Sequence, residues 1–468
     1  EKEIRIDVFQ LDVPTISIAD ADKGFKVLQG SELTITPIVD SFLETSYSWQ
    51  INGEDISNEL TCTLPTIELG EYQVRFATHN EDGDDEVTFK VEVCSPDQVD
   101  FNWTFLQTEY NMSAGRTIRI KPVDVNNALD AVYTWTVDNE QVQSGENDTY
   151  LFTSEQQGEH TVKVEMKNSY ILATQTLKVN VCPPAGTYQR KISATSSASM
   201  NKVYEYLPAP GQFINENHNT ITMAEACTYA EERINQTAYV SLGGFGGYII
   251  VGFDHSIVND GDYNIAITGN AFDGSSEPGI VWVMQDENGD GLPNDTWYEL
   301  RGSEYGKAET WQDYAVTYHK PTGIQLPTPW TDNHGQSGSI DYLGAFHRQD
   351  YYYPAWVKEK QYTLRGTRLK ERNYDQSGNG TYWVNDSYEW GYADNFSAID
   401  RLTDDDNYNA GPSDNHFKIS HAVTFDGKDA NLKYVDFIKV QVGVNSKSGW
   451  LGEISTEVFG IKDFNMLK

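Results

Sequence analysis

The sequence has few cysteines and no long hydrophobic run. Its 468 residues include four cysteines, at positions 62, 94, 182 and 227. These are too few for a disulfide scaffold, and they lack the C-x-x-C spacing of a zinc site. Cys62 and Cys94 could pair, although nothing in the sequence requires it. No apolar stretch approaches the roughly 20 residues that a transmembrane helix needs, so no transmembrane segment is expected.

Basic residues are also scarce. The chain carries 34 Lys and Arg against 70 Asp and Glu, which gives a formal net charge of −36. A surface this acidic repels phosphate backbones and anionic headgroups, so nucleic acid and membrane surfaces are not expected partners. The acidity suits neutral ligands and divalent cations. It is equally typical of an extracellular protein that uses charge only to stay soluble. The chain begins with EKEIRIDV, without an initiator Met, which indicates a trimmed mature form.

The residues that are abundant indicate an all-β protein. Aromatic residues make up 12% of the chain, with 28 Tyr and 11 Trp. Segments rich in Val, Ile, Thr and Tyr alternate with Gly, Asn and Asp, which is typical of β-sandwiches with long loops. The length exceeds what one ordinary core needs, so two to four domains are expected.

Two tandem repeats occupy the first part of the chain. YSWQINGE, from Tyr47, recurs as YTWTVDNE from Tyr133, and GEYQVRFATHN, from Gly70, recurs as GEHTVKVEMKN from Gly158. FKVEVC likewise recurs as LKVNVC. The Tyr-x-Trp alternation places both rings on one face of a strand, toward a sandwich interior. These repeats predict domains at residues 1–95 and 96–184.

The repeats resemble the PKD-like branch of the immunoglobulin-like fold. The Y-[ST]-W strand, the later G-E-[YH]-x-V strand and the following Asn carry the resemblance, which covers residues 1 to about 184. Such domains usually act as spacers that hold another domain away from a surface. The resemblance therefore concerns the fold and says little about function.

A different pattern begins after the stiff Cys182-Pro183-Pro184 junction. TMAEACTYAEERIN predicts one short helix, with Thr222 as its N-cap and Glu225 completing a capping box. Cys227 lies on the apolar stripe of this helix and is expected to be a buried small hydrophobe. The rest of residues 185–468 is predicted to be strand and loop. We expect one large β-sandwich of jelly-roll type, with long loops, that serves as the ligand-binding domain.

The acidic segment MQDENGDGLPNDTWYEL, residues 284–300, is longer than a hairpin turn requires. Its D-x-N-x-D-G pattern matches the first half of an EF-hand-type calcium loop, in which alternate oxygens face the ion. Position 12 of such a loop is Trp297 here instead of Glu, and Asp295 is the preferred substitute ahead of Glu299. The segment either wraps a structural calcium ion or is a solvated acidic turn. The candidate metal ligands are Asp286, Asn288, Asp290, Leu292 through its carbonyl, and Asp295.

Aromatic residues are concentrated between Tyr342 and Phe396, where 14 of them occur, about twice the density of the whole chain. Rings on loops beside Asn, Asp and Arg are typical of sugar capture, and they equally suit a flat apolar cofactor. The alternative is that the loops pack back on the sandwich as a secondary core. The candidate ligand-binding residues are Trp330, Tyr352, Trp356, Trp383, Trp390 and Tyr392.

No catalytic motif occurs in the sequence. G-x-S-x-G, H-E-x-x-H and P-loop patterns are absent, and the histidines show no metal-ligand spacing. Glu277, Glu304 and Glu453 lie near strand ends. A retaining glycosidase would need two such carboxylates about 5 Å apart, which sequence cannot test. We assign no catalytic residue and expect a protein that is not an enzyme.

The C-terminal part resembles the last domain of PKD-bearing cell-surface lipoproteins from gut Bacteroidetes. GGYIIVGFD, GNAFDGSSEPGIVWVMQDENGDGLPNDTWYELRGSEY, YYYPAW, GYADN and DFIKVQVGVNSKSGWLGEISTEV carry this resemblance. It implies a lipid anchor on the extracellular face of the outer membrane, beside a TonB-dependent transporter. The anchoring Cys is not in this chain, so the anchor rests on the resemblance alone.

These observations together predict a non-enzymatic surface capture protein. Two PKD-like spacers would present a β-sandwich that binds a neutral glycan or a corrinoid for nutrient uptake. Two other hypotheses stay open at this point: a glycan-active enzyme that uses paired carboxylates, and a purely structural adhesin.

Overall fold

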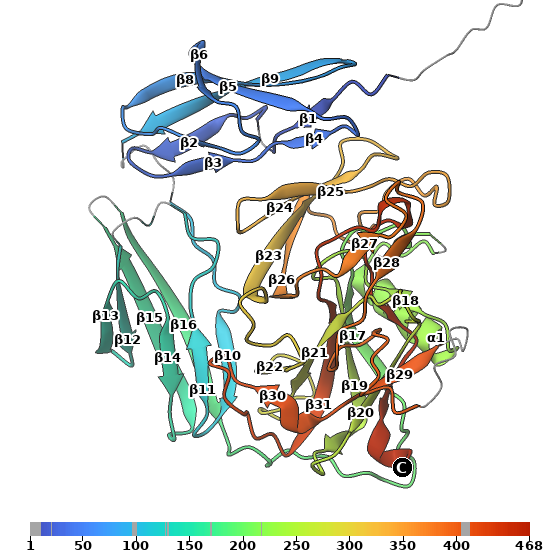
Figure 1. The fold of residues 1–468 in the computed structure, drawn as a ribbon. Coiled ribbons are helices and arrows are strands. Elements are labelled where there is room, and N and C mark those ends of the chain that lie inside the picture. Colours follow the sequence, from blue (N-terminus) through green and yellow to red (C-terminus); the bar gives the residue numbers. More distant parts are fainter. Residues whose placement is uncertain are drawn as a thin grey trace, which may run out of the picture.

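The computed structural model describes residues 11–19, 21–95, 101–126, 128, 131–168, 171–216, 218–403 and 412–468. Residues 1–10 and 96–100, where the first two domains were expected to begin, lie outside the described part. Two small sandwiches, drawn in blue and in cyan to green, adjoin a larger β-domain drawn from green to red (Figure 1). None of the helices in the described part of the chain has the length and apolarity to span a bilayer.

The first immunoglobulin-like sandwich is called repeat 1. Its main sheet has the order β2-β9-β8-β5-β6, with β2 parallel to β9, and the pairs β1-β4 and β3-β7 complete it. The strands are β1 (Thr15–Ser17), β2 (Phe25–Leu28), β3 (Leu33–Ile35), β4 (Ile38–Asp40), β5 (Ser46–Ile51), β6 (Glu54–Ser57), β7 (Cys62–Leu64), β8 (Gly70–Asn80) and β9 (Gly83–Cys94).

The second sandwich, repeat 2, has the same arrangement. Its main sheet has the order β10-β16-β15-β12-β13, with β10 parallel to β16, and β11 pairs with β14. The strands are β10 (Glu109–Ser113), β11 (Thr117–Ile120), β12 (Val132–Val137), β13 (Glu140–Gly145), β14 (Tyr150–Thr153), β15 (Gly158–Lys167) and β16 (Leu172–Cys182).

The repeated sequence motifs form equivalent structures in the two sandwiches. Trp49 and Trp135 are fully buried at the centres of separate cores, as the Tyr-x-Trp alternation predicts. The hairpin turns after these strands begin at Asn52 and Asp138, with φ of 52° and 49°. Asn and Asp tolerate this left-handed backbone better than most residues, which explains their use at this turn.

The C-terminal domain, from β17 to η4, contains three larger sheets. Their orders are β17-β19-β31-β21-β22-β30, β29-β20-β33 and β25-β24-β23-β26, and shorter pairs β18-β32 and β27-β28 join them. The strands are β17 (Lys202–Leu207), β18 (Val240–Ser241), β19 (Tyr248–Val258), β20 (Ile265–Gly269), β21 (Gly279–Met284), β22 (Trp297–Leu300), β23 (Trp311–His319), β24 (Thr328–Asp332), β25 (Ser337–Ile340), β26 (Gln361–Arg368), β27 (Asn373–Asp375), β28 (Trp383–Asn385), β29 (Ser413–Phe417), β30 (Ala422–Val423), β31 (Tyr434–Val442), β32 (Glu457–Val458) and β33 (Gly460–Asp463).

One α-helix, α1 (Met223–Asn235), occurs in the described residues. Three 3-10 turns accompany it: η2 (Ile419–His421), η3 (Gly449–Leu451) and η4 (Phe464–Met466). Thr222 accepts the Glu225 N–H and the Glu225 side chain accepts the Thr222 N–H, which confirms the predicted capping box. Cys227 is half-buried and packs against the main core, so its expected full burial is not reached. The all-β fold class expected from the sequence is confirmed.

The four cysteines are free in the structure, so Cys62 and Cys94 do not form the disulfide that the sequence left open. Cys62, Cys94 and Cys182 are buried, and burial raises the pKa of each thiol. They act as small hydrophobic residues at the ends of sandwich strands.

Repeat 2 is joined to the C-terminal domain by polar contacts centred on Arg116. Its guanidinium lies 3.4 Å from the Glu287 carboxylate and donates to the Gln285 side chain at 3.0 Å. The Ser113 N–H also donates to Glu287 at 2.8 Å. Nearby, Arg119 and Lys121 each lie 2.8 Å from the Asp313 carboxylate. This contact holds the base of the acidic loop against repeat 2.

Candidate functional site

The acidic loop joins β21 to β22 and is closed by its own hydrogen bonds. The Asp286 carboxylate accepts the backbone N–H groups of Gly289 at 2.7 Å and Gly291 at 3.0 Å. Asp290 accepts the side-chain amide of Asn288 at 2.8 Å. In this structure these carboxylate oxygens accept N–H groups of the loop itself.

Asp295 and Leu292 complete the predicted ligand set. Asp295 accepts the Glu287 N–H at 3.0 Å, and its second oxygen is buried without a hydrogen-bond partner. Burial raises the pKa of Asp295 to about 8. The Leu292 side chain is exposed. Within the described ranges, the carboxylates of this loop do not converge as a set of three ligands. Calcium binding here stays a prediction, and it requires the loop to exchange some of its N–H contacts for the ion.

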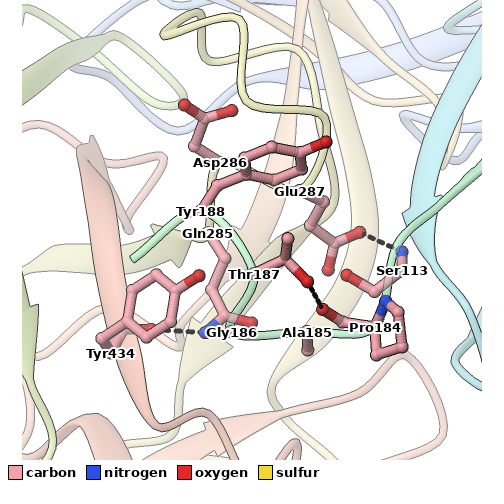
Figure 2. A pocket seen from close by; sticks show the side chains of 10 residues that line it. All are labelled: Ser113, Pro184, Ala185, Gly186, Thr187, Tyr188, Gln285, Asp286, Glu287 and Tyr434. Carbon is pink, nitrogen blue, oxygen red and sulfur yellow. Dashed lines mark hydrogen bonds between the residues drawn. The ribbon is translucent and has the colours of Figure 1, made fainter. Parts of the chain in front are cut away.

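A narrow hollow lies beside the loop, at the junction with repeat 2 (Figure 2). The linker from Pro184 to Tyr188 forms one side, and Gln285, Asp286 and Glu287 form the other. A Cβ at Gly289 would come within 2.6 Å of the Tyr188 ring, so the linker packs directly on the loop. The hollow has no room for a water molecule, and it is therefore a packed junction instead of a ligand site.

Three of the predicted ligand-binding rings are part of the core. Tyr352, Trp356 and Tyr392 are 1%, 6% and 2% exposed, so the expectation that they face solvent is wrong. Their polar atoms bind backbone: the Trp356 indole donates to the Tyr206 carbonyl at 3.1 Å, and the Tyr392 hydroxyl accepts the Glu304 N–H at 2.9 Å. Large rings bury well when a backbone group satisfies their polar end, and this favours packing over exposure.

The other three predicted rings are half-buried and lie apart. Trp330, on β24, packs against the main core. Trp383, on β28, has a buried indole nitrogen without a hydrogen-bond partner and lies against Gly449. Trp390 packs against His421, with ring centroids 5.1 Å apart. The six predicted rings therefore do not form one cleft, and Trp390 borders an open cavity that the other five do not line.

The cavity beside Trp390 has a volume of about 250 Å³. It lies where the end of β22 meets β29 and η2. Aromatic rings and hydrogen-bonding groups alternate on its walls. The lining residues are Tyr263, Leu300, Arg301, Trp390, Gly391, Ile399, Asp400, His416, Phe417, Lys418 and His421.

The charges around the cavity offset one another. Arg301 pairs with Asp429 at 2.8 Å, and Lys418 lies 3.8 Å from Asp262. Burial, followed by the nearby Arg301 and Lys418, lowers the pKa of His421, so this imidazole is neutral at neutral pH. The cavity thus offers donors and imidazole nitrogens without a large net charge.

The polar back wall of the cavity is held rigidly. Asp400 accepts the Gly391 N–H at 2.6 Å and the Asn415 side-chain amide at 3.0 Å. His416 contacts the Asp400 carbonyl through Nδ1 at 2.8 Å. Because hydrogen bonds already hold these groups in place, binding a ligand would cost them little conformational entropy.

Sequence reasoning identified Trp390 and missed the rest of this cavity. Tyr263, Arg301, Lys418 and His421 come from separate segments that share no motif. Sheet pairing across long sequence distances brings them together, and no local pattern reports such pairing.

A second surface does hold rings out to solvent. Phe346 is 64% exposed and Trp450 is 49% exposed, and their ring centroids are 6.2 Å apart. Neither ring was among the predicted ligand-binding residues. The two rings lie on the surface as an exposed aromatic pair, and neither lines the cavity beside Trp390.

The three glutamates considered for catalysis have different surroundings. Glu304 pairs with Lys307 at 2.9 Å and Arg372 at 3.0 Å, and these cations outweigh its burial and lower its pKa. Glu277 is half-buried and lies within a group of carboxylates near β32, and Glu453, in the segment that leads into β32, is buried. None of the three lines the cavity beside Trp390.

Comparison with protein families finds a match in the first part of the chain. The model of the PKD-like domain family matches residues 13–80 and 105–168, which lie in the two repeats. No curated protein matches the chain.

Solved immunoglobulin-like and fibronectin-like tandems cover a little over a third of the chain. The fibronectin(III)-like modules of Clostridium thermocellum CbhA match at 15% identity over 38% of this chain and 100% of theirs, with a TM-score of 0.20. A chimeric titin Z1Z2 matches at 20% identity over 37% and 98%, with a TM-score of 0.22. The Ig1-2 module of the Drosophila receptor phosphatase DLAR matches at 12% identity over 36% and 97%, with a TM-score of 0.19. These scores are too low to carry an argument. The family match shows two tandem PKD-like, immunoglobulin-like modules, which are domains of a structural or adhesion type and typically non-catalytic.

Proposed function

We propose that this protein is a non-enzymatic capture protein of the cell surface, and that the cavity beside Trp390 holds one sugar ring of a neutral glycan. The observation that carries the proposal is the combination of an indole wall, flanking hydrogen-bonding groups and a volume of about 250 Å³. A flat ring stacks on the C–H face of a pyranose, while polar side chains bind its hydroxyl groups.

The size of the cavity favours a sugar over a corrinoid. Pockets that enclose a drug-sized ligand have volumes of roughly 300–1,000 Å³. This cavity is slightly smaller, which suits a single ring, whereas a corrinoid macrocycle with its nucleotide loop is far larger. The offset charges of Arg301 and Lys418 favour a neutral sugar over an anionic one.

In this proposal the two PKD-like repeats hold the C-terminal domain, with its cavity, at the cell surface. PKD-like repeats are spacers, and repeat 2 is joined to the C-terminal domain by the Arg116 contacts. In this proposal the chain is lipid-anchored on the extracellular face of an outer membrane and passes its ligand to a TonB-dependent transporter. The resemblance of the C-terminal segments to Bacteroidetes surface lipoproteins supports that location and that partner.

The alternative of a glycan-active enzyme has less support. Glu304 is held by two cations, and the carboxylates that approach one another near β32 are largely buried and lie outside the cavity lining. A sugar in the cavity would therefore meet no pair of free carboxylates, although Asp400 lies on its wall.

Glycan arrays followed by calorimetry with the best neutral oligosaccharide test the proposal. Trp390→Ala should weaken binding by about 1–3 kcal/mol, because it removes the stacking wall. Trp450→Ala is the matched control, since that ring is exposed on the other surface. Unchanged affinity in Trp390→Ala, with loss in Trp450→Ala, would move the site to the Phe346 and Trp450 patch.

Two further measurements separate the other hypotheses. A cobalamin titration with a clear response, in the absence of glycan binding, would replace the glycan by a corrinoid. Release of reducing sugar from a bound polysaccharide, lost in Glu277→Gln, would favour the enzyme. If neither ligand class binds, a structural adhesin is the better description.

A further inference from the structure

Three carboxylates from separate segments meet near β32 in the C-terminal domain, and a fourth, Glu453, lies in the segment that leads into β32. Glu277 precedes β21, Asp394 lies in the loop after β28, and Glu457 begins β32. One oxygen from each of these three lies within 4.8 Å of the others. Glu453 precedes Glu457 by four residues, and its carboxylate accepts the Gln212 N–H at 2.7 Å.

The backbone fixes the positions of these side chains. Asp394 accepts the N–H groups of Asn270 at 2.8 Å, Ala271 at 2.9 Å and Glu457 at 2.9 Å. The Glu277 N–H in turn donates to the Asp394 carbonyl at 2.9 Å. Backbone hydrogen bonds between the segments thus hold the carboxylates near one another.

Two oxygens of the group are buried and have no hydrogen-bond partner. They are Oε1 of Glu457 and Oε2 of Glu453, in residues that are 4% and 5% exposed. Buried polar atoms are satisfied in the great majority of cases, so the unpaired oxygen of Glu457, a member of the three-carboxylate group, calls for a ligand. Within the described ranges, no lysine, arginine or histidine forms an ion pair with any of the four carboxylates.

We propose that Glu277, Asp394 and Glu457, with Glu453 beside them, bind a structural Ca²⁺ ion. Carboxylate oxygens without nitrogen or sulfur ligands select a hard cation. Oxygens bound at about 2.3–2.6 Å on opposite sides of Ca²⁺ lie up to about 5 Å apart, which accommodates the observed separations. Glu277 is half-buried, whereas Asp394 and Glu457 are buried.

A bound ion would fasten three segments of the C-terminal domain to one another. Ca²⁺ would supply the missing positive charge. This site is separate from the acidic loop of Asp286 to Asp295, and the two can be tested independently.

The test is titration of the EDTA-stripped full chain with Ca²⁺ alone, by calorimetry, together with metal analysis after dialysis. Glu457→Gln and Asp394→Asn should each bind one Ca²⁺ fewer than the wild type. Asp290→Asn, in the acidic loop, should still bind the ion of the Glu277, Asp394 and Glu457 group. Saturating Ca²⁺ should raise the Tm of the wild type and of Asp290→Asn by about 5 °C or more. Glu457→Gln should lose that response. Glu304→Gln is the matched control, because Glu304 is paired with cations elsewhere.

Several results would overturn the proposal. One is full Ca²⁺ stoichiometry in both Glu457→Gln and Asp394→Asn; another is a wild type that binds no Ca²⁺ at all. A response to Mg²⁺ with none to Ca²⁺ would overturn the choice of ion. If Glu457→Gln fails to fold, the stoichiometry of Asp394→Asn and of the wild type decides the matter.

Discussion

The two repeats have the same fold but differ in how they meet the rest of the chain. Repeat 2 contacts the C-terminal domain through Arg116 and through the Arg119 and Lys121 pairs with Asp313. Repeat 1 contributes a hydrogen bond from Ser337 to the Thr36 carbonyl, and among the described residues it forms no ion pair with that domain. Figure 1 shows repeat 2 alongside the larger domain. The comparison teaches that two copies of one fold in the same chain can differ in how closely they are joined to the domain that follows.

The largest expected effect concerns the contact that only repeat 2 makes. Arg116→Ala removes the cation from Glu287, whose side chain is 1% exposed. An unpaired buried carboxylate costs about 3 kcal/mol of unfolding free energy, and the cost is smaller where the group can take up a proton. Burial already raises the pKa of Glu287 to about 7. The loss should therefore be larger at pH 8 than at pH 5.5 in urea unfolding of the full chain.

Arg75→Ala in repeat 1 is the matched control. Arg75 pairs with Glu86 on the surface, with side chains 37% and 60% exposed. Such a pair contributes about 0–1 kcal/mol. Equal losses of unfolding free energy for Arg75→Ala and Arg116→Ala would mean that the Arg116–Glu287 pair stabilises the protein no more than an exposed surface ion pair.

The next effect compares the two central tryptophans. The Trp49 indole donates to the Glu59 carbonyl at 2.9 Å, whereas the Trp135 indole nitrogen is buried without a partner. Replacement by Phe removes similar volume in both cores. Trp49→Phe should therefore cost about 1 kcal/mol more than Trp135→Phe, because it also removes a hydrogen bond. Hydrogen exchange resolved by repeat measures each loss, and a larger loss at Trp135 would contradict the assignment.

Sequence predicted the repeats well because their signals are local. Strand alternation, the Asn52 and Asp138 turns and the Thr222 cap each depend on a few neighbouring residues. The burial of Tyr352 and Trp356 was missed for the opposite reason. Whether a loop ring packs inward depends on a distant backbone acceptor, such as the Tyr206 carbonyl for Trp356.

The candidate sites show the same division between local and distant information. The acidic loop is one continuous segment and was recognised from its spacing. The cavity beside Trp390 and the Glu277, Asp394 and Glu457 group each draw on several segments. The sequence drew attention to Trp390 and Glu277, but it did not indicate which residues each of them meets. Convergence of that kind comes from long-range strand pairing, which one sequence does not reveal.

The smallest expected effect concerns a residue that differs between the repeats. His160 occupies the position of Tyr72, and its ring nitrogens contact the Gln156 carbonyl at 3.0 Å and the Asp138 carboxylate at 2.7 Å. The Gln156 contact and then Asp138 raise the pKa of His160 against the effect of burial. A raised folded pKa adds stability below the unfolded value of 6.5, and that stability is lost as pH rises through the folded pKa.

The pKa of Asp138 sets the lower limit of the pH range in which the His160–Asp138 pair stabilises repeat 2. The Thr161 N–H and then His160 lower the pKa of Asp138, so its contribution is lost as pH falls below 3.8 through the folded pKa. Hydrogen exchange of β15 should show repeat 2 losing up to about 1 kcal/mol between pH 6 and 9. His160→Gln should remove that slope, and His79→Gln, at an exposed pair in repeat 1, should not change it. A slope that persists in His160→Gln would assign the pH dependence of repeat 2 to another group, and the His160–Asp138 pair would then not distinguish the two repeats.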